Sequence, residues 1–256
     1  MVFKNQDISI FYEVYGDHPK SVVILPGWGD TRKTFRYIIS YLSNFFTVYV
    51  IDYPGFGESP FPNRNLTIFD YADSIHQFLK ENNIQNSILI GHSFGGRIII
   101  TLAGYYQYSY SNIILMDSAG IKPPVTIRTY FRKMSYQLLM KFSRLLPKKW
   151  KKNYRKKIFS LFASDDYRNL TTNMRETFKN IVNYDLSDYL KNIRSRVLLI
   201  WGNQDTATPI RDARIMNRSI ADSELIILDK VGHFPYLERP DLINRIIFEQ
   251  LKEEIH

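Results

Sequence analysis

Residues 91–95 read Gly-His-Ser-Phe-Gly, the spacing of a serine nucleophile held on a tight turn between a strand and a helix. Positions two residues to either side of the serine must be tiny, because larger side chains would collide in this strained turn. The apolar run 87–90 precedes the motif and a predicted helix follows it. That helix would point its N-terminus at the site and favour developing negative charge. Ser93 is therefore our candidate nucleophile.

A serine hydroxyl needs a base to remove its proton. Among the five histidines, His92 adjoins Ser93, so we expect its side chain to point away from the serine side chain. His233 stands apart from the others, in the loop 230–235 beyond the last predicted strand. Loops at the carboxyl ends of parallel strands are where sites form, so His233 is the predicted base.

The base in turn needs a carboxylate to fix its tautomer. Asp205 follows a predicted strand at 196–201 and lies in the loop 202–209, which should face His233. Asp117, at the end of the preceding strand, is the alternative. The chain order Ser93, Asp205, His233 is the order expected for a nucleophile on this kind of turn. We expect Asp205 to orient the base.

The elements that position these residues alternate along the chain. Buried strands are predicted at 21–25, 46–51, 87–90, 113–116, 196–201 and 224–228, with helices at 31–42, 68–81, 94–103, 211–220 and 241–254. Residues 8–15 alternate like a half-exposed strand. Between 121 and 188 the pattern becomes helical and basic. The fold class is thus α/β, a doubly wound, mostly parallel sheet formed by 1–120 and 189–256, with a helical insertion at 121–188.

With these motifs the sequence resembles the α/β-hydrolase superfamily over nearly its full length. The matching stretches are 26–29, 52–59, 91–96, 202–205 and 232–233. The resemblance implies that 121–188 is a cap over the active site, and that the backbone N–H groups of Trp28 and Phe94 form an oxyanion hole. The chain departs from the family at Pro26, where a histidine often buttresses the turn. Relatives that open epoxides or remove halide carry aspartate in place of Ser93, which argues against both chemistries.

The composition of the chain argues against several other classes of protein. The chain has 256 residues and no cysteine, so disulfides and thiolate chemistry are impossible. The histidines lack metal-ligand spacing, and we expect neither a metal nor another cofactor. The N-terminal 15 residues lack the apolar stretch of a signal peptide, and no run approaches the length of a membrane span. We therefore expect a cytoplasmic protein.

The net charge of +9 belongs to one segment. Between Lys122 and Ser160 there are 13 Lys and Arg and no Asp or Glu, so the remainder carries −4 (9 − 13). Its densest part is 148–157, with Trp150 embedded. A solvated face is one interpretation; contact with an anionic membrane is the other. No nucleic-acid recognition motif is present, so no nucleic acid is expected. Apolar residues at helical spacing in this segment predict a cap helix: Ile127, Phe131, Met134, Leu138, Phe142 and Leu145.

These patterns predict a serine hydrolase that cleaves carboxylic esters or thioesters of small acyl substrates. Two alternatives remain open at this point. A related enzyme could cleave a carbon–carbon bond in a β-diketone-like substrate with the same three residues. A ligand-binding protein could keep the fold and the three residues with negligible turnover. The sequence sets neither the physiological substrate nor the oligomeric state.

Overall fold

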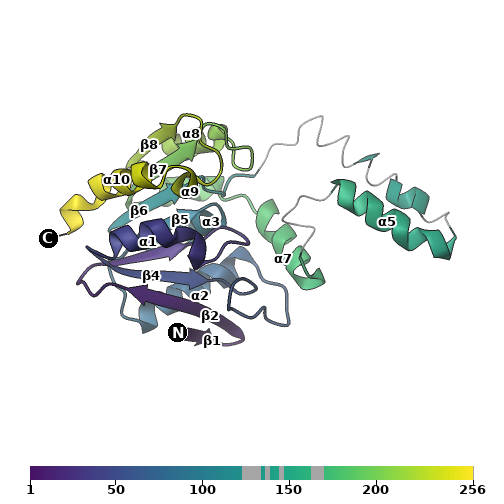
Figure 1. Cartoon of the computed structure of the whole chain (residues 1–256), viewed down its shortest axis with the longest axis horizontal. Coiled ribbons are helices and arrows are strands. Elements are labelled where there is room, and N and C mark those ends of the chain that lie inside the picture. The colour runs from purple at the N-terminus through teal and green to yellow at the C-terminus, as the bar shows by residue number, and fades with distance from the viewer. Residues whose placement is uncertain (123–133, 136–138, 144–146, 163–169, 256) are drawn as a thin grey trace.

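A computed structural model describes residues 1–122, 134–135, 139–143, 147–162 and 170–255 (Figure 1). In this part of the chain, eight strands form one sheet in the order β1-β2-β4-β3-β5-β6-β7-β8. The strands are β1 (Val2–Asn5), β2 (Ile8–Tyr15), β3 (Ser21–Leu25), β4 (Thr47–Asp52), β5 (Ile88–His92), β6 (Asn112–Met116), β7 (Arg196–Gly202) and β8 (Ser223–Leu228). The prediction of an α/β fold with a mostly parallel sheet is confirmed.

The order in which the chain adds strands to the sheet reverses at β3. From β4 through β3, β5, β6 and β7 to β8 all neighbouring strands are parallel, so their carboxyl ends share one edge. The chain passes from β3 outward to β4 and then returns to place β5 on the other side of β3. Such a switch point leaves a crevice between the loops that follow the two strands, and ligands bind there in open α/β sheets. The loops after β3 and β5 carry Trp28 and Ser93.

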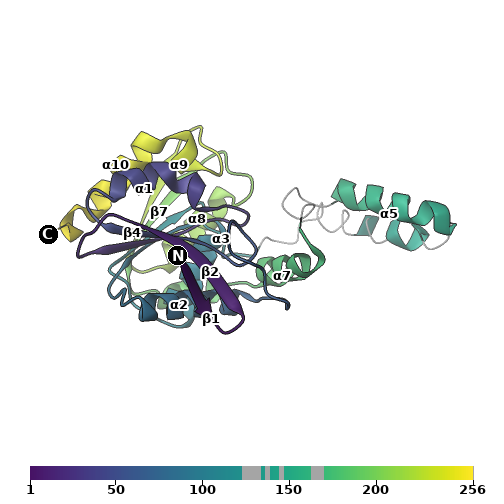
Figure 2. The ribbon, with the colours of Figure 1, turned by 60° about the horizontal axis from the view of Figure 1, so that its bottom comes forward.

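Helices cover both faces of the sheet (Figure 2). Alternate residues of β3 show the two layers: Val22 and Ile24 pack against α1 (Arg36–Leu42) and α10 (Pro240–Leu251), on one face. Val23 and Leu25 belong to the opposite core, with α2 (Ile68–Glu81), α3 (Phe94–Ile100) and α8 (Ile210–Ser219). Because both faces are covered, the parallel strands consist of continuous apolar runs rather than alternating patterns.

The amino-terminal edge differs from the sequence prediction. β1 pairs antiparallel with β2, which pairs antiparallel with β4, so the sheet begins with a hairpin. β1 was not predicted. Its turn contains Gln6 at φ 52°, and left-handed turns of this kind usually carry Gly, Asn or Asp. The sequence therefore lacks the usual signal of a hairpin there.

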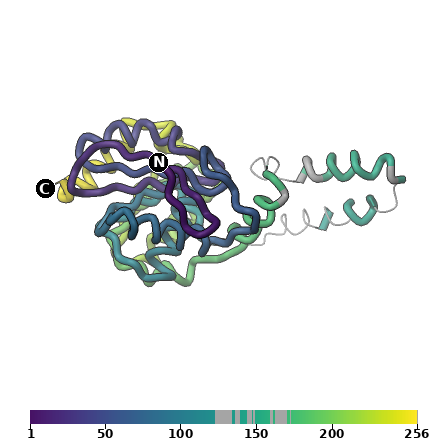
Figure 3. Tube along the Cα trace, turned by 90° about the horizontal axis from the view of Figure 1, so that it is seen from below, coloured from purple at the N-terminus to yellow at the C-terminus, as the bar shows by residue number. Residues whose placement is uncertain are grey.

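The predicted insertion at 121–188 lies partly outside the described residues. Of the predicted apolar stripe, only Met134 and Phe142 are described, and both are exposed; the other four residues fall outside the described ranges. Two longer helices are described, α5 (Lys148–Phe162) and α7 (Thr172–Asn183). α7 lies beside the sheet domain, whereas α5 lies apart from it (Figure 3). No helix in the described part of the chain has the length and apolarity to cross a membrane.

Candidate active site

Ser93 occupies the strained turn that its motif predicts. It sits between β5 and α3 with φ 48° and ψ −107°, a backbone conformation that residues other than glycine rarely adopt. Its backbone N–H donates to the Met116 carbonyl oxygen at 3.1 Å, and its carbonyl oxygen accepts from Ala119 N at 2.9 Å. The end of β6 and the loop that follows it therefore hold the turn in place.

The flanking glycines are required by close packing. A Cβ on Gly95 would lie 1.9 Å from the Leu25 carbonyl oxygen, and one on Gly91 would lie 2.6 Å from the side chain of Ile99. The first turn of α3 thus rests directly against the end of β3. This brings the N-terminus of α3 to the loop after β3, where the second predicted oxyanion donor lies.

His233 and Asp205 are joined in the structure. Nδ1 of His233 lies 2.7 Å from Oδ2 of Asp205. Asp205 also accepts from Ala207 N at 2.7 Å, Thr208 N at 3.1 Å and the Thr208 hydroxyl at 2.5 Å. Burial alone would raise the pKa of Asp205, but the hydrogen bonds from His233 and Thr208 outweigh it and lower the pKa to about 2. Asp205 is therefore ionised at neutral pH.

Asp117, the alternative acid, makes no hydrogen bond to His233 in the described structure. Its Oδ1 accepts from Gly202 N at 3.0 Å, and its Oδ2 is buried without a partner. Burial raises the pKa of Asp117 to about 9, and the neighbouring Asp205 charge adds to this effect. A neutral carboxyl cannot stabilise an imidazolium as a carboxylate does, so this geometry favours Asp205 as the partner of the base.

A metal ion has little to bind in this cluster. Asp117, Asp205 and His233 are the described residues whose possible ligand atoms lie within 4.8 Å of one another. Asp205 already accepts from four donor atoms, which uses the roughly four lone-pair sites of a carboxylate. Asp117 is protonated at neutral pH. The cluster suits a hydrogen-bond network better than a cation.

The two predicted oxyanion donors are free of competing acceptors. Within the described structure, neither the Trp28 nor the Phe94 backbone N–H donates a hydrogen bond to the protein. Phe94 N is the first N–H of α3, and the first N–H groups of a helix have no partner within the helix. Their side chains pack edge to face, with ring centroids 5.2 Å apart. Both N–H groups can therefore donate a hydrogen bond to a negatively charged oxygen.

A cavity of about 420 Å³ connects these groups, a size typical of small-molecule sites. Ser93, His233, Trp28 and Phe94 all line it. α7 contributes the apolar wall, which consists of Phe178, Ile181 and Val182. Ser93 and His233 face one cavity, but no hydrogen bond joins their side chains in the described structure. In hydrolases such bonds often tighten only when substrate is bound.

Sequence reasoning missed several residues that hold these groups. Thr208 hydrogen-bonds Asp205, and the Trp201 indole N–H fixes the Thr208 carbonyl at 2.8 Å. Glu238 accepts from two backbone N–H groups beside His233. Their one signal in the sequence is that they are polar or aromatic residues within a few positions of Asp205 and His233. Such a signal does not say where the side chain points.

Comparison with known proteins agrees with the fold. Residues 20–240 match the alpha/beta hydrolase fold family, and the chain belongs to that family. Membership accounts for the mostly parallel sheet with helices on both faces. The chain is a hydrolase of the esterase-like kind.

Among curated proteins, the chain is similar to a pimeloyl-[acyl-carrier protein] methyl ester esterase of Wigglesworthia glossinidia brevipalpis. The two are 27% identical over 262 residues, which cover 93% of this chain and 95% of the relative.

Two solved structures share the fold. One is an enol-lactonase from Burkholderia xenovorans LB400, with TM-score 0.76 and 18% identity, covering 98% of this chain and 100% of that one. The other is a meta-cleavage product hydrolase from Pseudomonas fluorescens IP01, with TM-score 0.71 and 20% identity, covering 96% and 95%. At these identities the likeness concerns the fold alone.

Proposed function

We propose that this protein is a serine esterase in which Ser93 is the nucleophile, His233 the base and Asp205 its orienting acid. The observation that carries the proposal is the 2.7 Å contact between His233 and Asp205 beside the cavity that Ser93 lines. The unpaired N–H groups of Trp28 and Phe94 at the same cavity support it, because ester hydrolysis passes through an oxyanion.

The chemistry follows from the protonation states. Asp205 is ionised and accepts only, so Nδ1 of His233 carries a proton and Nε2 offers its lone pair. Nε2 takes the Ser93 proton as Oγ attacks the acyl carbon, and the carbonyl oxygen becomes an oxyanion held by Trp28 N and Phe94 N. His233 then returns the proton to the departing alcohol, leaving an acyl enzyme. Water attacks this ester by the same steps and releases the acid.

For the substrate we propose the ester of an apolar acyl chain. The apolar wall from α7 favours a hydrocarbon chain over a polar group. The name of the Wigglesworthia relative, a methyl ester esterase acting on an acyl group carried by a protein, supports a small alcohol as leaving group. Methyl esters of acyl chains are thus the first substrates to assay, with the thioester analogues beside them.

A labelling experiment tests the proposed roles. A fluorophosphonate probe should modify the wild-type protein at Ser93 and leave Ser93→Ala unmodified. Ser40→Ala, an exposed serine on α1, is the matched control and should label like the wild type. Labelling of Ser93→Ala at another serine would overturn the assignment.

A substrate panel tests the reaction class. We expect turnover of p-nitrophenyl esters, varying with acyl chain length. Turnover of a vinylogous β-diketone with no ester activity would instead identify a carbon–carbon bond hydrolase. Binding of acyl compounds without any turnover would identify a ligand-binding protein.

We also propose that α5 contacts an anionic membrane surface. Trp150 and Leu161 are 65% and 64% exposed and lie eleven residues apart, about three helical turns, so they share one face of α5. Lys149, Lys152 and Lys156 are exposed on the same helix, and its 15 residues include no acidic one. Exposed apolar side chains on a strongly basic helix are typical of helices that lie in the headgroup region.

A further inference from the structure

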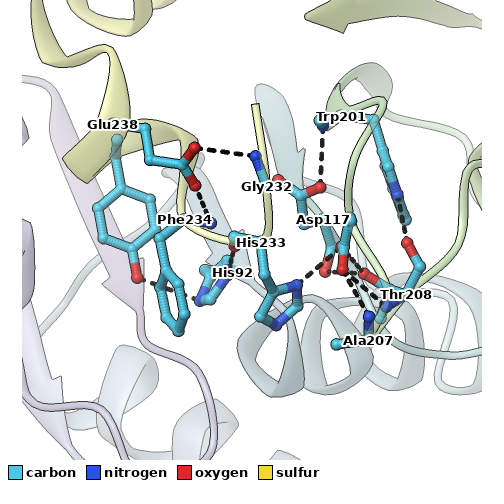
Figure 4. A network of polar contacts seen from close by, with 12 residues as sticks. His92, Asp117, Trp201, Ala207, Thr208, Gly232, His233, Phe234 and Glu238 are labelled. Carbon is cyan, nitrogen blue, oxygen red and sulfur yellow. Dashed lines mark hydrogen bonds and ion pairs between the residues drawn. The ribbon is translucent and has the colours of Figure 1, made fainter. Parts of the chain in front are cut away.

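The backbone around His233 is held by side chains on both sides (Figure 4). Gly232 N donates to Glu238 Oε2 at 2.9 Å, and Phe234 N donates to Oε1 of the same carboxylate at 3.3 Å. The carbonyl oxygen of His233 itself lies 2.7 Å from Nε2 of His92. The residue before the nucleophile therefore contacts the backbone of the base directly.

This contact determines the tautomer of His92. A carbonyl oxygen only accepts hydrogen bonds, so Nε2 must carry a proton. His92 is 1% exposed, and burial lowers its pKa, which favours the neutral ring. In a neutral ring with a proton on Nε2, Nδ1 is an acceptor. The hydroxyl of Tyr236 lies 3.2 Å from this nitrogen, and its one hydrogen is shared between Nδ1 and Oδ2 of Asp30, which lies 3.4 Å from Nδ1.

The side chain of Tyr236 also contacts the loop that carries Trp28. Tyr236 OH lies 3.1 Å from Oδ2 of Asp30, and Asp30 N donates to the Gly27 carbonyl at 3.2 Å. A Cβ on Gly27 would lie 2.8 Å from Nδ1 of His92 and 3.0 Å from Oδ2 of Asp30. The side chains of His92 and Asp30 therefore pack directly against the backbone of Gly27. In the α/β-hydrolase family a histidine at position 26 often supports this turn. This chain has Pro26 there, and His92 and Asp30 pack against the turn.

We propose that His92 is a positioning residue that sets the base loop and the oxyanion loop relative to Ser93. It is adjacent to the nucleophile in the chain, bonds the backbone of the base, and contacts the loop of the Trp28 donor. The nucleophile, the base and the oxyanion donor must be aligned to within a fraction of an ångström. The buried ring of His92 adjoins or contacts the segments that carry all three. Misplacement by about 1 Å can cost about 10²-fold in rate. The inference rests on the proposed ester hydrolysis.

The test compares His92→Gln with His92→Asn. The glutamine amide can extend about as far as Nε2 and donate to the His233 carbonyl, whereas the asparagine amide is one methylene too short. We expect His92→Asn to lower kcat by about 10- to 100-fold with KM within about 3-fold of wild type, and His92→Gln to recover most of this loss. Equal kcat in the wild type and His92→Asn would overturn the proposal.

Two further readouts separate positioning from stability. Urea unfolding gives the free energy of unfolding of each variant. A downfield proton NMR signal from the His233–Asp205 hydrogen bond reports the alignment of the base. We expect this signal to shift or broaden in His92→Asn and to return in His92→Gln. An unchanged signal, with activity lost only in proportion to the unfolded fraction, would make His92 a packing residue.

Tyr236→Phe provides the test if neither His92 variant folds. It removes one oxygen atom and keeps the ring that stacks on Phe35, 4.3 Å between centroids. We expect kcat to fall several-fold without a matching rise in KM, and an unchanged kcat would contradict the proposal. Failure of the wild-type protein to hydrolyse any ester would instead refute the proposed function, so the two failures are distinguishable.

Discussion

Asp117 and Asp205 lie side by side at the carboxyl ends of β6 and β7, and the structure displaces their pKa values in opposite directions. Asp205 gains hydrogen bonds from His233 and Thr208, which keep it ionised. Asp117 has one backbone donor and is otherwise buried, so it stays protonated. Two carboxyl groups at one site therefore take different states, as in enzymes that divide acid and base tasks between neighbours.

Replacement of the two acids should have very different effects on catalysis. Asp205→Asn removes the charge that orients His233, and a loss on the order of 10⁴ in kcat is known for this change in serine proteases. Asp117→Asn replaces a neutral carboxyl with a neutral amide of similar shape, so we expect kcat within about 10-fold of wild type. Steady-state hydrolysis of p-nitrophenyl esters measures both. A larger loss in Asp117→Asn would transfer the orienting role to Asp117.

The same pair predicts how stability depends on pH. The pKa of Asp117 is about 9 in the folded chain against an ordinary 3.8, so between about pH 4 and pH 9 the folded state keeps a proton that the unfolded chain has lost. The contribution of Asp117 to the free energy of unfolding therefore falls as pH rises through this window. Asp205 affects stability at lower pH. Its lowered pKa stabilises the folded state above about pH 4, and this stabilisation is lost as the pH falls toward 2.

Urea unfolding of wild type and Asp117→Asn from pH 5 to pH 9 measures this effect. The variant lacks the titrating group, so its stability relative to wild type should increase with pH. A constant difference across the range would show that Asp117 has an ordinary pKa.

Gly95→Ala should destabilise the protein more than a glycine replacement in open space. The new Cβ would lie 1.9 Å from the Leu25 carbonyl oxygen, so α3 must move away from β3, and overpacking of this kind typically costs 1–3 kcal/mol or more. Gly29→Ala is the matched control: its Cβ meets nothing within 4 Å, and only the positive φ of 81° is unfavourable, at roughly 1–2 kcal/mol. Urea unfolding gives both values. Equal costs would mean that the elbow adjusts to a methyl group.

Binding to anionic vesicles should depend on α5. We expect sedimentation with phosphatidylglycerol vesicles at low salt and weaker binding at 0.15 M, where the Debye length is about 8 Å. Replacing Lys149, Lys152 and Lys156 with Gln should weaken binding by about two orders of magnitude, since each basic residue near the surface is worth ~1 kcal/mol. Hydrolysis of small esters should be unchanged.

The control for this binding replaces three exposed lysines of the sheet domain, Lys4, Lys33 and Lys80, with Gln. This variant has the same net charge as the α5 variant and should bind nearly like wild type. Equal recovery with neutral and anionic vesicles would contradict a membrane role. Binding to an acidic protein without binding to vesicles would indicate a protein partner instead.

The sequence predicts the sheet domain well because its signals are local. The bounds of β2, β3 and α2 agree with the predicted 8–15, 21–25 and 68–81, since alternation marks β2 and an apolar run marks β3. In the structure, a capping box of Thr67 and Asp70 begins α2. The supports of the site depend on contacts between distant segments. His92 meets the His233 backbone across 141 positions, and the residues near it in the chain do not specify which group its ring contacts. No local pattern encodes such a contact.

The bare backbone of Gly27 limits how this site can change over evolutionary time. A side chain there would overlap the ring of His92 and the carboxylate of Asp30. A lineage could enlarge position 27 only after position 92 had become smaller, and by the inference above that first step would slow the enzyme. The two positions are therefore coupled in the order of their mutations, and sequences that carry a bulky residue at 27 should differ at 92 as well.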